Sequence, residues 1–379
     1  MKPLIKEVTT LKELRTFIRY PKMLYKGNPY WVPTLFEDDY STLRWDKNPA
    51  FEHCEAKYWL AYLDGKLVGR IAAIYNKRYQ QHWGKNYGRF NWFDFIDDTD
   101  VSSALLETAE TWLKSFNIEA IHGPLGFTDM DREAWLIEGF DELGTMVGWY
   151  NHPYYREHIE KLGYTKAIDW VEYELTVPTE PVEVVARVAE SAKKRFGLHI
   201  LKVKKKKDIL KYAPQMFEVF NQAYEHLYGV VPLSDKQIEL AIKQYFGLCI
   251  PELLPFVINE KDELVGFSVT MPSLSRALQK SGGEIMPFGF IPLLKAMNKN
   301  DRADLYLIGV KEEYKGKGVN AIMMDHIIKE FQKRGITKVE SNPELENNNL
   351  VQTQWKYFEK RQHKRRRVFI KPLTSTAGD

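Results

Sequence analysis

The chain has 379 residues, of which 44% are hydrophobic and 28% are charged, and its formal net charge is only +3. These values are typical of a globular protein with two domains of ordinary size, and they exclude a disordered chain and a general polyanion or nucleic-acid binder. No apolar run approaches the roughly 18 residues of a transmembrane segment, and the N-terminus has no apolar signal core, so we expect a cytoplasmic protein.

The first half of the chain predicts a mixed sheet with flanking helices. Its clearest element is a hairpin in which two apolar strands flank the turn Asp64-Gly65. Asp100 is expected to cap a helix, because the apolar residues after it recur on one helical face. Strands are expected at residues 4–8, 59–63, 67–74, 89–96, 118–122 and 167–177, and helices at residues 10–20, 100–116 and 151–162.

The second half begins after Pro178-Thr-Glu-Pro181, which has the composition of a domain boundary. It predicts a second hairpin and, after an insertion at residues 271–300, a strand, a glycine-containing turn and a helix. The insertion is expected to form either a lid or wall of an acceptor pocket, or an extra packed helix. Strands are expected at residues 199–204, 255–259, 264–270, 305–310, 338–341 and 366–370, and helices at residues 182–196, 208–227, 234–247, 319–334 and 349–360.

Cysteines and histidines give no sign of a metal site. Cys54 and Cys249 lie far apart and form no metal-binding or redox motif. His122, His152 and His158 also lack the spacing of metal ligands, and we expect them to be packed or surface side chains. No bound metal is therefore expected.

The segment Leu305–Asn320 carries the strongest functional signal. A buried strand leads into the turn Lys315-Gly-Lys-Gly318, and a helix starts directly after it. Glycines allow backbone N–H groups to approach a ligand, the helix N-terminus adds partial positive charge, and the two lysines add full charges. This arrangement predicts a site for a pyrophosphate or a similar anion, with an ordinary tight turn as the alternative.

The window Glu313-Tyr-Lys-Gly-Lys-Gly318 resembles the acyl-CoA cradle of the GNAT (N-acetyltransferase) superfamily, whose pattern is Gln/Arg-x-x-Gly-x-Gly/Ala between a strand and a helix. Glu313 stands where the pattern has glutamine or arginine. The resemblance implies acetyl-CoA or a longer acyl-CoA as co-substrate. The residues that it places around acyl-CoA are Val310, Tyr314, Lys315, Gly316, Lys317, Gly318, Val319, Asn320 and Asn348.

The order of elements in both halves is similar to that of this superfamily. Leu67-Val-Gly69 and Leu264-Val-Gly266 occupy the same place in the two hairpins, and Asn151–Tyr164 resembles the superfamily's Asn…Tyr-Glu-Lys-Leu-Gly-Phe motif. The chain therefore resembles a tandem GNAT protein of the α/β class (α+β, mixed sheet). We expect two GNAT-like domains, residues 1–178 and residues 179–379, each a twisted mixed sheet flanked by helices.

The first copy is interpreted as degenerate for CoA. The loop that corresponds to the cradle, Phe93–Asp100, contains four carboxylates and no glycine, so it would repel a pyrophosphate. This domain is expected to act as a scaffold or to shape the acceptor site, and acyl-CoA is expected in the second domain.

The resemblance also implies direct transfer of an acyl group from a thioester to an amine. A backbone N–H near Val310 would polarise the thioester carbonyl. A tyrosine on the last helix protonates the leaving thiolate in the family; that position falls on Trp355 here, and Tyr357 is the candidate acid. Asn348 is expected either to bond the pantetheine arm or to cap the helix. The candidate bases are Glu340, Glu344 and Glu346.

We interpret the chain as an acyl-CoA-dependent N-acyltransferase whose acceptor is a small or lipid-like amine. A catalytically inactive GNAT-like binding module and a peptidoglycan-bridge type of transferase that uses aminoacyl-tRNA are the alternatives. The run Lys360–Arg367 has six basic residues in eight, and it is interpreted as a contact for the CoA 3′-phosphate or for anionic lipid, or as a solvated turn. Peripheral contact with a membrane therefore stays open.

Overall fold

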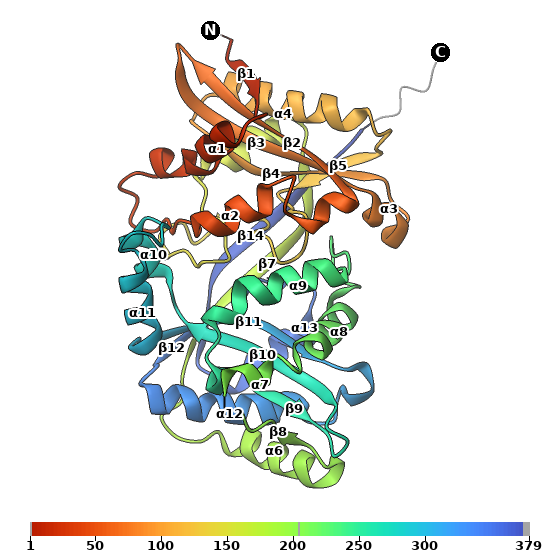
Figure 1. Ribbon diagram of the computed structural model, residues 1–379, viewed down its shortest axis with the longest axis vertical. Coiled ribbons are helices and arrows are strands. Elements are labelled where there is room, and N and C mark those ends of the chain that lie inside the picture. Colours follow the sequence, from red (N-terminus) through yellow and green to blue (C-terminus); the bar gives the residue numbers. More distant parts are fainter. Residues whose placement is uncertain (1, 204, 374–379) are drawn as a thin grey trace. The chain divides into compact units, whose positions relative to one another are not determined.

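The computed structural model describes residues 2–203 and 205–373 (Figure 1). The chain divides into two compact units that are not consecutive in sequence. Unit 1 comprises Met1–Val171, Ser275–Leu293 and His363–Asp379, and unit 2 comprises Glu172–Leu274 and Leu294–Gln362. A single division after residue 178 does not reproduce these units, because two later segments of the chain return to unit 1.

Unit 1 is built on a mixed sheet with helices on both faces. Its strands follow in the order β1 (Leu4–Glu7), β2 (Cys54–Leu63), β3 (Lys66–Asn76), β4 (Tyr87–Phe95), β5 (Ala120–Gly123) and β14 (Lys360–Pro372), and β6 (Trp135–Glu138) also pairs with β14. All neighbours are antiparallel except β4 and β5, which are parallel. Its helices are α1 (Leu11–Leu24), α2 (Phe36–Leu43), α3 (Lys77–Trp83), α4 (Thr99–Lys114), α5 (Tyr154–Lys161) and α10 (Ser275–Ser281).

The alternation of side chains along β3 separates two apolar cores. Ile71 and Ala73 pack in the core that contains α4, whereas Ala72 and Ile74 pack in the core that contains α1. The predicted hairpin is the β2–β3 pair. Its turn residues Asp64 and Gly65 both have positive φ, as a tight two-residue hairpin turn requires.

Unit 2 also consists of mixed strands with flanking helices. Its strands follow in the order β7 (Thr165–Thr176), β12 (Lys338–Glu340), β11 (Arg302–Val310), β10 (Leu264–Pro272), β9 (Phe256–Ile258) and β8 (His199–Ile200), and β13 (Glu344–Leu345) pairs with β7. Its helices are α6 (Glu183–Phe196), α7 (Lys206–Ile209), α8 (Ala213–Tyr224), α9 (Asp235–Tyr245), α12 (Val319–Arg334) and α13 (Asn349–Gln352), and α11 (Phe290–Asn298) begins in unit 1 and ends in unit 2.

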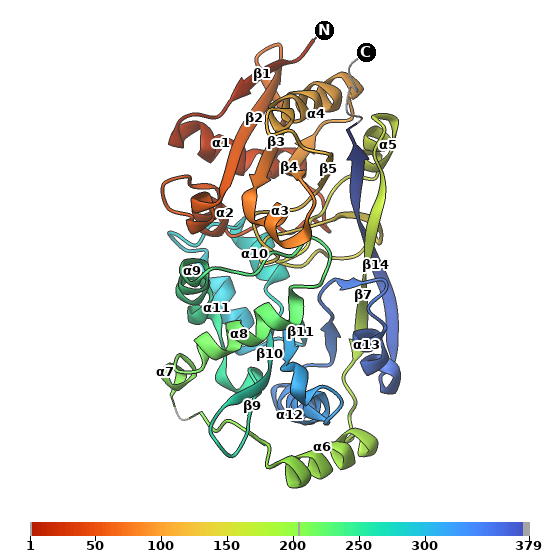
Figure 2. The ribbon, with the colours of Figure 1, turned by 90° about the vertical axis from the view of Figure 1, so that its right-hand side faces the viewer.

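Two glycines show which helix covers which face of the second sheet. A Cβ on Gly266 would lie 2.6 Å from Val319 of α12, and a Cβ on Gly309 would lie 3.3 Å from Val219 of α8. Gly266 pairs with Val310, the neighbour of Gly309. Gly266 and Gly309 therefore occupy adjacent positions of the ladder and point to opposite faces of the sheet. Helices α8 and α12 therefore cover opposite faces of β10 and β11 (Figure 2).

The last long strand of each half completes the sheet of the other unit. Strand β14 comes from the second half, and Phe369 to Pro372 pair with β5 of unit 1. Strand β7 comes from the first half, and its residues Glu174 to Thr176 pair with β12 of unit 2. Neither sheet is therefore made from one half of the sequence alone.

Most of the insertion at residues 271–300 belongs to unit 1. Gln279 donates to the carbonyl oxygens of Pro29 and Trp31 at 2.8 and 3.0 Å. The Phe36 N–H donates to the carbonyl of Gly283 at 2.9 Å. These bonds support the alternative interpretation of a packed helical segment.

The expected loop Phe93–Asp100 needs correction. Residues 93–95 continue β4, where Asp94 is buried and its carboxylate bonds to Arg70 at 2.7 Å. Asp98, and not Asp100, caps α4, since its side chain accepts the N–H groups of Asp100 and Val101.

The basic run is not a solvated turn, because it forms part of β14. Arg367 bonds to Asp169 at 2.7 Å and Arg366 is buried. Among the described residues, no helix combines the length and apolar composition that crossing a bilayer requires.

Candidate functional site

Strand β11 has an edge that its parallel neighbour leaves unpaired. The pairing of β11 with β12 covers only Arg302 to Asp304, whereas the pairing with β10 continues to Val310. The two parallel strands therefore separate beyond Asp304. Backbone groups of residues 305–310 that face away from β10 are available to side chains or to a ligand.

Two side chains occupy part of this edge. Asn342 donates to the carbonyl oxygen of Tyr306 at 2.8 Å. The Tyr224 hydroxyl donates to the carbonyl oxygen of Ile308 at 3.1 Å and accepts its N–H at 3.3 Å. Because backbone groups two residues apart face the same edge, the N–H of Val310 is next in this series. The sequence did not single out Tyr224, since it ends a helix and lies in no motif.

The turn after β11 has the backbone of an anion cradle. Gly316 and Gly318 have φ values of +75° and +81°, which favour glycine. A Cβ on Gly316 would meet no atom within 4 Å, whereas a Cβ on Gly318 would lie 2.8 Å from that of Ala192. Gly318 is the N-cap of α12 and has no side chain to accept its first N–H groups. Those donors and the helix dipole remain for a ligand.

The side chains around the turn supply charge and polarity. Lys315 bonds to Glu312 at 2.5 Å, and both side chains are exposed. The Lys317 ammonium lies 5.0 Å from the centre of the Tyr314 ring. The buried Oδ1 of Asn320, in the first turn of α12, has no hydrogen-bond partner among the described residues. A polar ligand at this helix end would find both a cation and an amide.

Glu344 is a buried carboxyl group on β13, two residues after Asn342. Its Oε1 accepts the indole N–H of Trp355 at 2.7 Å, while no described residue bonds its Oε2. Burial raises the pKa of Glu344 to about 7, although the Trp355 bond acts in the opposite direction. A carboxyl group in this state can exchange a proton near neutral pH, as a general base requires.

A known protein family matches the part of the chain that contains this site. The model of the acetyltransferase (GNAT) family matches residues 213–360, which include β11, the glycine turn, α12 and Glu344. This part of the chain is similar to a GNAT domain. The expected relationship to GNAT proteins is thereby confirmed for this part of the chain.

Two proteins of known name align with most of the chain. Protein YghO of Escherichia coli K12 is 28% identical over 382 positions, which cover 98% of this chain and 95% of YghO. A protein named bacterial ceramide synthase, from Caulobacter vibrioides, is 27% identical over 316 positions, which cover 81% of this chain and 80% of that protein.

A solved structure extends the likeness to both copies. A tandem GNAT protein from the clavulanic acid biosynthesis pathway covers 99% of this chain and 100% of its own, with a TM-score of 0.56 and 11% identity. At this identity the likeness shows the fold alone. The fold is that of a tandem GNAT protein, as predicted.

The remaining predicted site residues differ in their burial and in their contacts. Glu340 is buried on β12, and Glu346 follows β13. Asn348 accepts the N–H of Val351 at 3.4 Å, which is a capping contact. Tyr357 is 45% exposed, and the ammonium of Lys356 lies 4.7 Å from the centre of its ring. Of these residues only Glu344 combines burial with a free polar atom.

The corresponding helix in unit 1 lacks an open N-terminus. Asp98 accepts the first N–H groups of α4 at 2.9 and 3.2 Å, so a carboxylate already satisfies the donors that an anion would use. Asp97 adds a second carboxylate, which bonds to His158 at 2.9 Å. These contacts favour the interpretation of the first copy as degenerate for CoA.

Proposed function

We propose that the chain is an acyl-CoA-dependent N-acyltransferase that binds acyl-CoA at the glycine turn of unit 2. The observation that carries the proposal is the N-terminus of α12, which lacks a side-chain cap. The glycine turn joins it to β11, a strand that its parallel neighbour leaves unpaired beyond Asp304. A pyrophosphate would accept hydrogen bonds from the N–H groups of Gly316 and of residues 318–320, and the ammonium of Lys317 would add charge. The pantetheine arm would follow the edge of β11 toward Val310.

The reaction forms a C–N bond and breaks the C–S bond of the thioester. Glu344 would take a proton from the acceptor ammonium, and the resulting amine would attack the thioester carbonyl. The N–H of Val310 would stabilise the developing oxyanion. The thiolate leaves and takes a proton from a hydroxyl group, for which Tyr224 and the exposed Tyr357 are the candidates. The proton that the nitrogen loses as the amide forms restores this hydroxyl group.

We propose a lipid-like amine as acceptor. The relative named bacterial ceramide synthase aligns with 81% of this chain, and a ceramide synthase attaches an acyl chain to a long-chain amine. A GNAT-like module that binds CoA without turnover is the second candidate, because Glu313 occupies the first position of the cradle motif.

Gly316→Asp and Gly316→Asn form a matched pair that tests acyl-CoA binding. Both side chains tolerate positive φ and have similar size, and the position is open, so the two variants differ mainly in charge. We expect acetyl-CoA and longer acyl-CoAs to raise the melting temperature of the unmodified protein and of Gly316→Asn. Gly316→Asp should bind acyl-CoA at least about tenfold more weakly than Gly316→Asn does. Equal binding by the two variants, or no shift with any acyl-CoA, would contradict the proposal.

Tyr224→Phe tests the proton donor. This change removes the hydroxyl that bonds to Ile308 and retains the ring that stacks on Phe220 at 4.4 Å. If Tyr224 is the acid, kcat should fall by about tenfold to a hundredfold with little change in KM. Tyr357→Phe is the matched comparison. A loss of kcat in Tyr357→Phe alone would assign the proton donor to Tyr357.

A further inference from the structure

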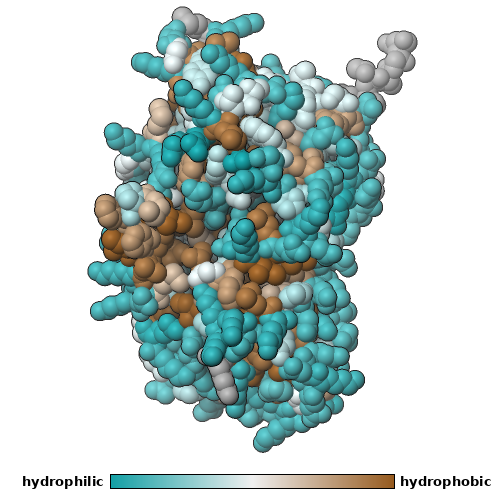
Figure 3. All heavy atoms as spheres, in the orientation of Figure 1, coloured by the Kyte–Doolittle hydropathy of each residue, from teal (hydrophilic) through white to brown (hydrophobic). Residues whose placement is uncertain are grey.

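An apolar protrusion follows α10 in unit 1. Five of the thirteen exposed large hydrophobic residues of the described chain fall in this short segment and the start of α11. They are Met286 (73% exposed), Phe288 (72%), Phe290 (39%), Ile291 (53%) and Leu294 (52%). Figure 3 shows apolar side chains gathered at the surface where Figure 1 labels α10 and α11. An apolar surface of this kind marks an interaction site.

The protrusion has no polar side chains. The ten residues Ile285–Leu294 read Ile-Met-Pro-Phe-Gly-Phe-Ile-Pro-Leu-Leu. Protein–protein interfaces carry roughly one hydrogen bond per 100–200 Å², usually with polar side chains among the apolar ones. This stretch offers only its backbone for such bonds. Acyl chains, which form no hydrogen bonds, are a better match for it.

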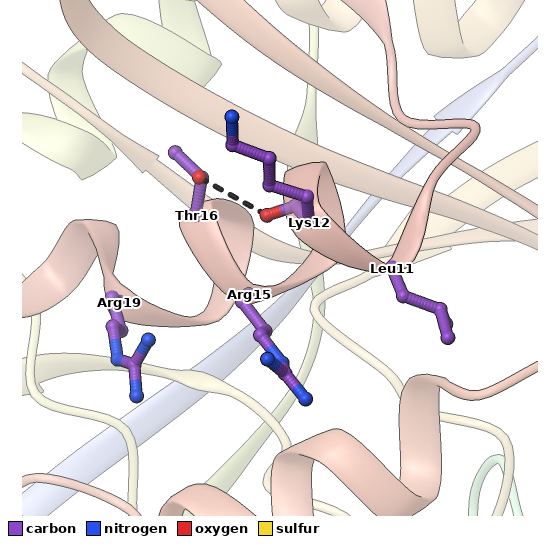
Figure 4. A pocket seen from close by; sticks show the side chains of 5 residues that line it. All are labelled: Leu11, Lys12, Arg15, Thr16 and Arg19. Atoms are coloured by element: carbon purple, nitrogen blue, oxygen red, sulfur yellow. Dashed lines mark hydrogen bonds between the residues drawn. The ribbon is translucent and has the colours of Figure 1, made fainter.

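A basic helix face lies beside this protrusion. Exposed cations recur on α1 with helical spacing, while Leu14, Phe17 and Ile18 are buried on the other face. A hollow of about 420 Å³ follows this exposed face, and Figure 4 shows the guanidinium groups of Arg15 and Arg19 extending from the same side of the helix. The exposed cations are Lys12, Arg15 and Arg19, and the half-buried Lys22 follows them.

One carboxylate connects the two features. Glu284, the residue directly before the protrusion, accepts hydrogen bonds from Lys22 at 2.8 Å and from Arg19 at 3.3 Å. It is the only acidic residue between positions 275 and 300, and its charge is balanced by these bonds. In α2, Glu37 is exposed, whereas Asp39 is buried. Within unit 1, the exposed cations that precede the protrusion in its own segment are Arg276 and Lys280.

We propose that this face docks on the surface of an anionic phospholipid bilayer. The side chains of Met286, Phe288 and Ile291 would enter the boundary of the acyl region, and Lys12 and Arg15 would meet lipid phosphates. Surrounding lysines and arginines complement anionic headgroups. Docking on a bilayer requires no acyl transfer. It rests on the proposed function only because a lipid-like acceptor would be present at the membrane surface.

Vesicle flotation tests the docking surface with the full chain. We expect binding to phosphatidylcholine vesicles with one quarter phosphatidylglycerol, and binding at least about tenfold weaker to pure phosphatidylcholine or at 1 M salt. The variant Met286→Ser/Phe288→Ser/Ile291→Ser should bind anionic vesicles at least about tenfold more weakly. Lys12→Gln/Arg15→Gln should bind severalfold more weakly and with less dependence on salt.

The control Leu4→Ser/Leu210→Ser changes exposed leucines elsewhere and should bind as the unmodified chain does. Acyl-CoA thermal shifts, measured on every variant, report the proposed function separately, so either proposal can fail alone. No binding to anionic vesicles, or equal binding by the triple serine variant, would overturn the docking surface. A dimer in light scattering that the triple variant abolishes would instead assign this face to a second copy of the chain.

Discussion

Glu344→Gln is expected to lower kcat by about 10²–10³ at pH 8 and to leave acyl-CoA binding intact. The glutamine amide cannot take a proton from the ammonium group of the acceptor. It has nearly the same shape as the carboxyl group, and its oxygen can still accept the indole N–H of Trp355. Steady-state release of free CoA measures the effect. The exposed Glu359→Gln is the matched control and should keep its activity.

The same substitution should change the pH dependence. Glu344 acts as a base only in its carboxylate form, so kcat/KM of the unmodified protein should rise with pH and level off above about 7, where the pKa of the buried group lies. This limb should be absent in Glu344→Gln. A pH profile that is unchanged by the substitution would remove Glu344 from the mechanism.

The stability of the folded protein should fall over the pH range in which its activity rises. Burial raises the pKa of Glu344 from 4.5 to about 7, so between these values the folded state holds a proton that the unfolded chain has released. The free energy of unfolding therefore falls as pH rises through this window, by up to about 1.4 kcal/mol per pH unit. Glu344→Gln removes this cost. A less stable variant at pH 8 would indicate a structural role for the carboxylate.

Gly318→Ala is expected to destabilise unit 2 by roughly 2–4 kcal/mol and to abolish acyl-CoA binding. The backbone has φ +81°, and the added methyl group would lie 2.8 Å from Cβ of Ala192 on α6. Alanine therefore strains the backbone and forces α6 and α12 apart. Urea unfolding and acyl-CoA thermal shifts measure the two effects.

Ala192→Gly separates the steric clash from the backbone strain, because it removes the atom that the new methyl group would meet. The double variant Gly318→Ala/Ala192→Gly should recover part of the lost stability but keep the cost of positive φ. Additive effects of the two substitutions would show that the close approach of α6 does not constrain Gly318.

Much of the fold could be predicted because its signals are local. The Asp64-Gly65 turn marked one hairpin, and the strand, turn and helix predicted from residue 305 to residue 334 followed from apolar spacing and glycine positions. The pairing of β14 with β5 could not be predicted, since it joins residues far apart in the chain. The cap of α4 was wrong by two residues, because Asp98 and Asp100 are equally suitable by type.

The candidate site, too, could be predicted only in part from the sequence. The glycines of the cradle could be located because positive φ at a helix N-terminus leaves a trace in sequence. Glu344 was one of three acidic candidates, and only the structure shows that its Oε2 is buried without a partner among the described residues. Tyr224 could not be found, since its contact with Ile308 depends on how α8 packs on the sheet.

The pairing of β14 with β5 also bears on the order in which the protein is made. Strands β1 to β5 leave the ribosome first, but β5 has no partner on its outer side until β14 is translated. Throughout that interval unit 1 presents an open sheet edge, which can pair with other chains. The nascent first half therefore depends on β14, which is translated much later, to close that edge. Chaperone binding would matter most during this interval.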